Sequence, residues 1–218
     1  MGACGGTASA EPRSTPSAAA AAGAADARTL AAAQLLAGLL SPDAVGHGFL
    51  AQAGYPKSTD SPIGSLADTG TAPCRTVIDG GGSIGSQSEA HTVLGRKGDE
   101  STVAKESVAQ FSPGDATTNL AGLGERFADN CASYTSTLDD GTLVKHKVTV
   151  ARPRLGDEAL LLGDLYETAT APRYSVKTLD VRYRDVVVSV TYLGDAATVD
   201  AYDFQGQVKA IAAKLGVG

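Results

Sequence analysis

The second half of the chain contains four segments with the alternating pattern of β-strands, and turns of only a few residues join them. A parallel connection needs a crossover of a dozen or more residues, so these short turns require antiparallel neighbours. This feature constrains the fold more than any other part of the sequence. The four predicted strands are Leu143 to Ala151, Ala159 to Thr168, Tyr174 to Tyr183 and Val186 to Leu193.

Helical patterns precede and follow these strands. Between Pro113 and Cys131, apolar residues recur at steps of three and four, and Ser112 or Asp115 can cap the helix. A closing helix from about Val199 to Leu215 is predicted by an apolar stripe of Phe204, Val208, Ile211, Ala212 and Leu215. Strands in sequence with helices before and after them predict an α+β fold, a mainly antiparallel twisted sheet with helices packed on one face.

The first half of the chain is less regular. Thr29 can cap a short amphipathic helix whose leucines recur at helical spacing until a Ser-Pro pair ends it. From Asp43 to Pro73, glycines and prolines punctuate an irregular segment. Cys74 to Ile78 and Val103 to Phe111 are candidate short strands, and Ser86 to Gly95 reads as loop or strand.

Residues 2–6, Gly-Ala-Cys-Gly-Gly, resemble the processing site of a bacterial lipoprotein, in which the cysteine becomes the lipid-modified first residue. Met1 stands where leucine is usual, and the basic and apolar regions of a signal peptide do not precede it. We therefore expect lipidation at Cys4 and a native signal peptide that this sequence lacks. The alternative is an ordinary N-terminus with an incidental cysteine.

The segment from Gly5 to Arg28 consists mostly of Ala, Ser, Thr, Pro and Gly. Such a segment cannot bury enough apolar surface to offset the entropy of ordering, so it is predicted to be a flexible tether. The length that remains suits one domain with its own core. We therefore divide the chain into residues 1–28, a lipobox remnant with a disordered tether, and residues 29–218, a single α+β domain.

Charge and hydropathy exclude two classes of partner. The 218 residues carry a formal charge of -6 and no basic cluster that would neutralise phosphates, which disfavours nucleic-acid binding. The longest mostly apolar stretch, Leu30 to Leu40, is too short to cross a bilayer. Membrane attachment is therefore predicted only through a lipid on Cys4, at the extracytoplasmic face of the cell membrane.

If Cys4 carries a lipid, Cys74 and Cys131 remain as an even pair in an exported protein, where disulfides form and persist. A bridge between them would contribute about 4 kcal/mol in the chain-entropy model. Two buried free thiols in a cytosolic protein are the alternative.

Four features occur together in the C-terminal half: a helix that ends in Cys131, a turn from Leu155 to Ala159 that opens a strand, the hairpin of residues 181–188, and a final amphipathic helix. In these features the chain resembles the PknH-like extracellular sensor domains of actinobacteria, which stand at the outer end of membrane kinases and also occur as free-standing lipoproteins. The resemblance extends roughly over residues 30–215. The kinase sensors carry more disulfides, and Arg184 stands where a glycine is usual in the hairpin.

This resemblance implies an extracytoplasmic binding domain with a cleft formed by the sheet and its flanking segments. It implies no catalytic residues.

A glycine-rich stretch supports a rival interpretation. Ser83 lies in a match to G-x-S-x-G, the signature of a hydrolase nucleophile, and an acid (Asp129 or Asp139) and His146 follow in the chain. The signature requires a strand, a sharp turn and a helix, whereas the residues after Ser83 read as loop or strand. His146 alternates with two lysines, a pattern that we interpret as a solvent-facing histidine in a strand. The same stretch matches a dinucleotide signature, but no helix follows it.

Other candidate sites are weaker. The three histidines are far apart and share no helical spacing with a carboxylate, and no Cys/His spacing indicates a metal, so neither metal nor cofactor is predicted. Arginines near the turns of the C-terminal strands could meet an anionic ligand if they converge with tyrosines on one cavity. The candidate ligand-binding residues are Tyr166, Arg173, Arg182 and Tyr192.

Together these patterns predict a lipid-anchored, extracytoplasmic, sensor-like lipoprotein without catalytic activity, whose partner is an unknown small ligand or an envelope protein. Two alternatives stay open. One is a small secreted serine hydrolase built on Ser83, and the other is an envelope lipoprotein that acts through protein contacts or as a chaperone.

Overall fold

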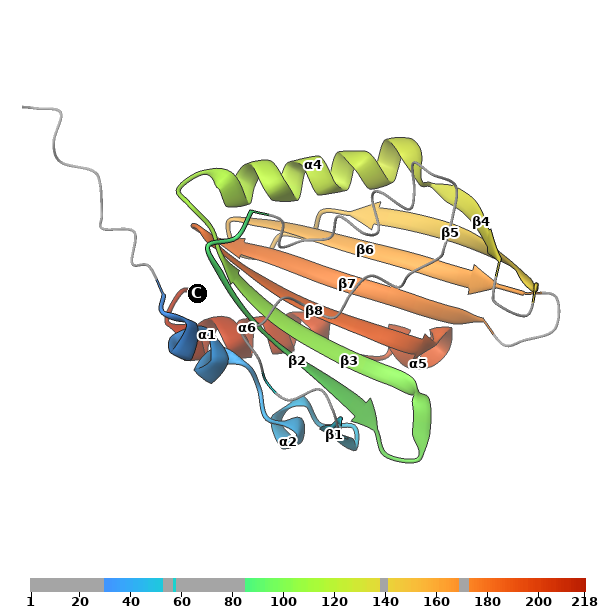
Figure 1. The fold of residues 1–218 in the computed structure, drawn as a ribbon, viewed down its shortest axis with the longest axis horizontal. Helices are drawn as coiled ribbons and strands as arrows, with labels where there is room; N and C mark the ends of the chain where they lie inside the picture. The colour runs from blue at the N-terminus through green and yellow to red at the C-terminus, as the bar shows by residue number, and fades with distance from the viewer. Residues whose placement is uncertain (1–29, 53–56, 58–84, 138–140, 169–172) are drawn as a thin grey trace, which may run out of the picture.

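The computed structural model describes residues 30–52, 57, 85–137, 141–168 and 173–218. Its centre is one eight-stranded sheet in the order β1-β2-β3-β8-β7-β6-β5-β4, in which every neighbouring pair is antiparallel (Figure 1). The strands are β1 (Phe49–Ala51), β2 (Ser88–Arg96), β3 (Asp99–Gln110), β4 (Ser133–Thr137), β5 (Leu143–Ala151), β6 (Glu158–Glu167), β7 (Tyr174–Tyr183) and β8 (Val186–Asp195). The helices are α1 (Ala32–Gly38), α2 (Pro42–Val45), α4 (Asp115–Asn130), α5 (Ala196–Asp200) and α6 (Phe204–Leu215).

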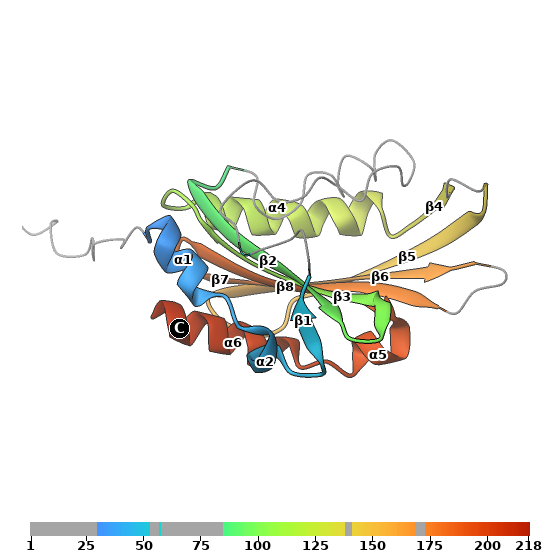
Figure 2. The same cartoon turned by 60° about the horizontal axis from the view of Figure 1, so that its bottom comes forward.

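The sheet is covered on both faces. In β8, Val188 and Val190 pack in a core with residues of α1 and α6, whereas Val187 packs with Leu120 of α4 and Leu160 of β6. Figure 2 shows α4 on one side of the sheet and α1, α2, α5 and α6 on the other. We call these two sides the α4 face and the α6 face.

The antiparallel α+β fold is therefore confirmed, but the expected packing of helices on one face is corrected to packing on both. The physical reason is visible in β8, where three consecutive valines, 186 to 188, are all buried. A strand that is apolar on both sides needs cover on both sides.

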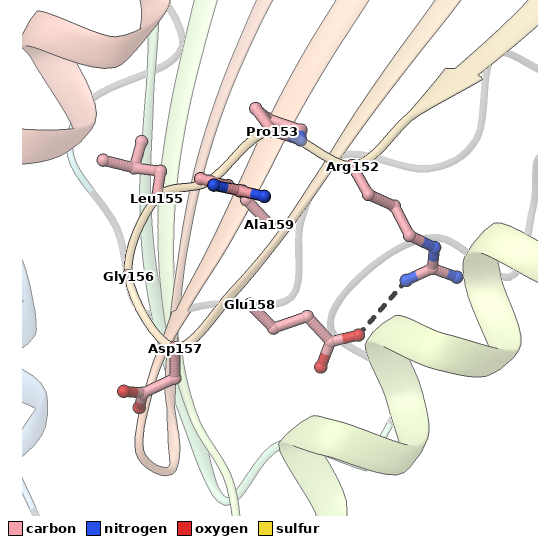
Figure 3. Close-up of a pocket in the computed structure, with 8 residues that line it drawn as sticks. Arg152, Pro153, Leu155, Gly156, Asp157, Glu158 and Ala159 are labelled. Carbon is pink, nitrogen blue, oxygen red and sulfur yellow. Dashed lines mark hydrogen bonds and ion pairs between the residues drawn. The ribbon is translucent and has the colours of Figure 1, made fainter.

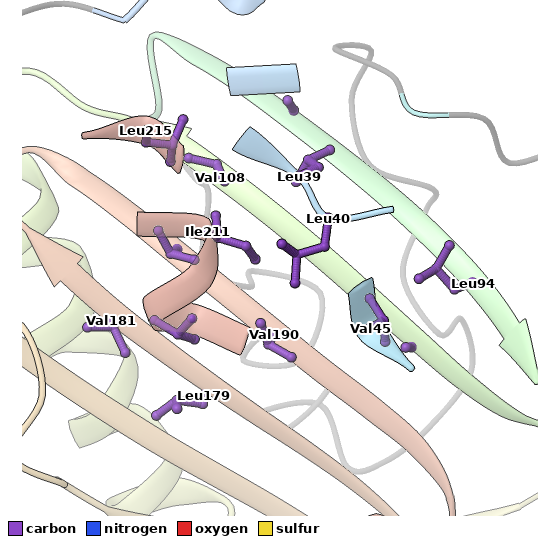
Figure 4. Close-up of a cluster of buried hydrophobic side chains, with 14 of the residues drawn as sticks. Leu39, Leu40, Val45, Leu94, Val108, Leu179, Val181, Val190, Ile211 and Leu215 are labelled. Carbon is purple, nitrogen blue, oxygen red and sulfur yellow. The ribbon is translucent and has the colours of Figure 1, made fainter. Parts of the chain in front are cut away.

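The larger core lies on the α6 face (Figure 4). Leu39 and Leu40, which follow α1, and Ile211 and Leu215 of α6 are buried against the middle strands of the sheet. Alternate residues of these strands complete the core: Leu94, Ala104, Val108, Leu179, Val181, Val188 and Val190. The two terminal parts of the described chain thus meet on one face of the sheet.

Most predicted elements are present, with some differences in detail. β5 and β7 have the predicted bounds, and β6, β8, α4 and the predicted strand at 103–111 are confirmed with shifts of a few residues at their ends. The closing helix is divided into α5 and α6 because Asp203 caps a new helix, accepting a hydrogen bond from the backbone N–H of Gly206. The predicted strand from Cys74 to Ile78 and the tether of residues 1–28 lie outside the described residues.

Candidate functional site

The α4 face carries polar side chains on its middle strands. Lys105 of β3 lies opposite Thr191 of β8, which lies opposite Thr178 of β7. In the next row of the same face, Ser107, Ser189 and Asp180 are neighbours across the same three strands. We call these six residues the polar floor. All are buried or half-buried. The residues that alternate with them along the same strands point to the α6 face and are mostly apolar.

Asp180 is the most deeply placed group of the polar floor, with 2% of its surface exposed. It accepts a hydrogen bond from the Ser189 hydroxyl. Burial raises the pKa of Asp180 to about 6, while the Ser189 hydrogen bond and the charge of Lys105 act in the opposite direction. The pKa of Lys105 is lowered by burial, against the attraction of Glu89 and Asp180. The floor therefore holds opposite charges where water is scarce, a setting that favours ligands with complementary polar groups.

A second polar group of residues lies on the same face at the far strands, and we call it the His146 cluster. Its members are Tyr134 and Ser136 of β4, His146 of β5, and Asp164 and Tyr166 of β6. The Ser136 Oγ lies 2.8 Å from His146 Nε2, and His146 Nδ1 lies 3.1 Å from Asp164 Oδ2. Ser136 and His146 are only 4% and 5% exposed.

Aromatic rings enclose the imidazole. The ring of Tyr134 stacks on His146 with centroids 4.1 Å apart, and the ring of Tyr166 meets it edge-on at 4.6 Å. The Tyr134 hydroxyl donates a hydrogen bond of 2.7 Å to Asp164 Oδ2. Burial raises the pKa of both tyrosines, and the neighbouring Asp164 adds to this effect. Both phenols are thus held in their protonated form.

The four predicted ligand-binding residues are not brought together. Tyr166 belongs to the His146 cluster on the α4 face. Arg173, which precedes β7, is exposed and pairs with Glu167 at 2.6 Å. Arg182 lies near the opposite end of β7, where it pairs with Glu158 at 3.4 Å. Tyr192 is fully buried on the α6 face, where it accepts a hydrogen bond from the Gln207 side chain, so it belongs to the core.

The turn between β5 and β6 forms an open surface hollow, shown in Figure 3, that is lined by residues 152–159. Arg152 forms an ion pair of 3.2 Å with Glu158, and Arg182 contacts both Glu158 and Asp157. Figure 3 shows the Arg152 and Glu158 side chains pointing toward each other beside α4. Because carboxylates already neutralise these arginines, the hollow is a poor match for the anionic ligand that the sequence suggested.

The sequence interpretation missed the His146 cluster. The expected solvent-facing His146 is wrong: Lys145 and Lys147 are exposed, and the two-residue alternation points His146 to the covered face of the sheet. Ser133 to Thr137 shows a matching alternation, with Tyr134 and Ser136 buried, and this signal could have identified the partners. Ser83, the candidate nucleophile of the alternative serine-hydrolase interpretation, lies outside the described residues. Asp129 is exposed on α4, and the carboxylate that contacts His146 is that of Asp164; Asp139 lies outside the described residues.

Within the described ranges, no group of three or more His, Cys, Asp or Glu side chains is arranged to hold a metal ion. None of the described helices is long and apolar enough to span a membrane.

Comparisons with known proteins gave one informative result. No family model and no curated protein matches the sequence. Among solved structures, the extracellular domain of PknH from Mycobacterium tuberculosis matches with a TM-score of 0.55 and 20% sequence identity, over 86% of this chain and 95% of that one. The chain therefore shares the fold of the PknH extracellular domain.

Proposed function

We propose that this protein is a lipid-anchored, extracytoplasmic lipoprotein of the actinobacterial sensor type, whose activity is to bind a small polar ligand without chemical turnover of it. The fold shared with the extracellular domain of PknH supports the location and the sensor-like role. The sequence supports the anchor, since residues 2–6 resemble a lipoprotein processing site.

The polar floor is the observation that carries the binding role. A sheet face that serves only for packing is mostly apolar, as the α6 face is; the carboxylate buried there, Glu106, accepts a hydrogen bond from the Leu40 N–H and holds the N-terminal segment. The α4 face instead gathers six polar side chains on three neighbouring strands, with Asp180 buried and Lys105 half-buried, each with a pKa displaced by burial. Placing charged groups away from water destabilises the fold, and such groups cluster at binding sites. A ligand with hydrogen-bond donors and acceptors would offset the cost of burying both Asp180 and Lys105.

The proposal includes a disulfide between Cys74 and Cys131. Cys131 is fully buried at the end of α4, packed near Tyr134 and Val148. Cys74 lies outside the described residues. A bridge from Cys131 would attach the segment around Cys74 to the protein near β4 and β5.

Nuclear magnetic resonance of the ¹⁵N-labelled domain tests the binding role. Four small polar compounds are titrated separately as probes: trehalose, N-acetylmuramyl dipeptide, glycerol 3-phosphate and citrate. We expect at least one probe to shift the amide signals of Lys105, Thr178 and Ser189 in a saturable manner. Asp180→Asn should weaken the binding of that probe, and the exposed control Asp200→Asn should leave the binding unchanged. Saturable shifts that centre on residues 152–159, or no saturable shifts, would contradict the assignment.

A further inference from the structure

The His146 cluster contains a serine, a histidine and an aspartate in a continuous hydrogen-bonded series. Ser136 Oγ lies 2.8 Å from Nε2 of His146, and the opposite ring nitrogen lies 3.1 Å from Asp164 Oδ2. This is the arrangement of nucleophile, base and orienting acid that recurs in hydrolases on unrelated folds, where geometry and not sequence position identifies it.

The hydrogen bonds determine which ring nitrogen carries the proton. Asp164 Oδ2 already accepts a hydrogen bond from the Tyr134 hydroxyl, so it acts as an acceptor toward His146 as well. The Nδ1 atom must then carry the hydrogen, which leaves Nε2 as an acceptor. The Ser136 hydroxyl therefore donates to Nε2, as a serine nucleophile does to its general base.

The surroundings hold this arrangement in place. Tyr134 stacks on one side of the imidazole and Tyr166 meets its edge, so the ring has little freedom to rotate. Asp164 Oδ1 is buried and has no hydrogen-bond partner among the described groups, so Asp164 is not fully satisfied by the contacts of the resting protein. Ser136 itself belongs to β4, the outermost strand of the sheet, between the exposed residues Thr135 and Thr137.

We propose that Ser136 is an activated nucleophile that accepts the acyl group of small esters. Its Oγ attacks the carbonyl carbon while His146 Nε2 takes the hydroxyl proton. The bond between that carbon and the leaving oxygen breaks, and His146 returns the proton to the departing alcohol. The acyl group stays on Ser136 until water, activated in the same way, releases it as an acid. Because Ser136 is only 4% exposed, the substrate class is limited to small acyl groups.

This inference goes beyond ligand binding at the polar floor and does not depend on it, since it uses a different set of side chains. A serine outside both clusters provides a control. The Ser101 hydroxyl donates a hydrogen bond of 2.6 Å to Asp99, so its partner is a carboxyl group and not an imidazole.

Acylation by 4-nitrophenyl acetate tests the proposal on the intact chain. Nitrophenol release is followed by absorbance, and the acetyl group is located by tryptic mass spectrometry. We expect one acetyl group on the peptide that contains Ser136, and we expect hydroxylamine to remove it because it is an ester. Acetyl groups on lysines are amides and resist hydroxylamine, which separates background reaction from the proposed one.

The variants give the decisive comparison. Ser136→Ala should abolish the hydroxylamine-sensitive adduct, Asp164→Asn should slow its formation by about 10³-fold or more, and Ser101→Ala should leave it unchanged. Thermal unfolding confirms that each variant is folded. A wild-type chain that acquires only hydroxylamine-resistant acetyl groups, or that reacts as fast as Ser136→Ala, overturns the proposal whatever the variants' stability.

Discussion

The side chain of Glu106 accepts a hydrogen bond of 2.9 Å from the backbone N–H of Leu40, which lies far from it in the sequence. Glu106 is a fully buried residue of β3, and Leu40 follows α1. Lys57 and Lys214 both donate to the carbonyl of the adjacent Leu39, at 2.9 and 2.7 Å. These contacts fix the N-terminal helices onto the α6 face of the sheet.

Replacement of Glu106 by alanine should destabilise the domain by about 2–4 kcal/mol, because the Leu40 N–H loses its buried partner and a cavity remains. Glu106→Gln keeps an acceptor for that N–H and should cost less. Urea unfolding at pH 7 measures both free energies. Equal losses for the two variants would show that the Leu40 hydrogen bond does not account for the effect.

The stability of the domain should depend on Asp180 between about pH 4 and pH 6. Burial raises its pKa from 3.8 to about 6 in the folded state, so folding favours the protonated form. This contribution is fully present below pH 3.8 and is lost as the pH rises through 6, by on the order of 2–3 kcal/mol. Unfolding of the wild type and Asp180→Asn at intervals across this range should show the difference.

The control for this experiment is Asp200→Asn, which removes an exposed carboxylate of α5. It should keep the wild-type change of stability with pH. An Asp180→Asn curve parallel to the wild-type curve would mean that Asp180 does not titrate in this range.

Two glycines of α4 should respond differently to alanine. Among the described residues, no atom outside the helix backbone lies within 4 Å of a Cβ placed at Gly122, so Gly122→Ala should stabilise the helix by about 1 kcal/mol. A Cβ at Gly124 would lie 2.7 Å from Arg152 Nη2 and 3.0 Å from Leu160 Cδ1. Gly124→Ala should therefore be less stable than Gly122→Ala by about 1–3 kcal/mol, as measured by thermal unfolding. Equal stability of the two variants would contradict the close packing of α4 on β6.

The hairpin between β7 and β8 contains a strained residue. Arg184 has a φ of 57°, a region that glycine adopts more easily than other residues. Arg184→Gly should raise the free energy of unfolding by about 0.5–1 kcal/mol, whereas Arg184→Ala should not, because alanine keeps the strain. Chemical unfolding of the three proteins gives the comparison. A stabilising alanine would indicate that the arginine side chain, and not the backbone, is unfavourable.

The elements that could be predicted are those whose side chains alternate clearly. β5 and β7 were found with their observed bounds because their alternation is bounded by turn residues. β1 and β4 were missed since one is only three residues long and the other contains no aliphatic residue. β2 stayed ambiguous because it buries His91 and Thr92, which are polar.

The site was harder to predict than the fold. Tyr192 is a core residue and not part of a site on the α4 face, because it shares a strand face with Val188 and Val190, and this alternation is visible in the sequence. The polar floor depends on which residues of β3, β7 and β8 become neighbours. That register joins segments far apart in the chain, and no local pattern specifies it.

The central claim, that the protein is a lipid-anchored extracytoplasmic domain, is tested most directly by intact and tryptic mass spectrometry of the mature protein from its native cell. We predict a membrane-fraction protein whose first residue is a lipid-modified Cys4 and whose Cys74 is joined to Cys131. A cytosolic protein that retains Met1, carries no lipid and has free thiols at both positions would contradict the claim.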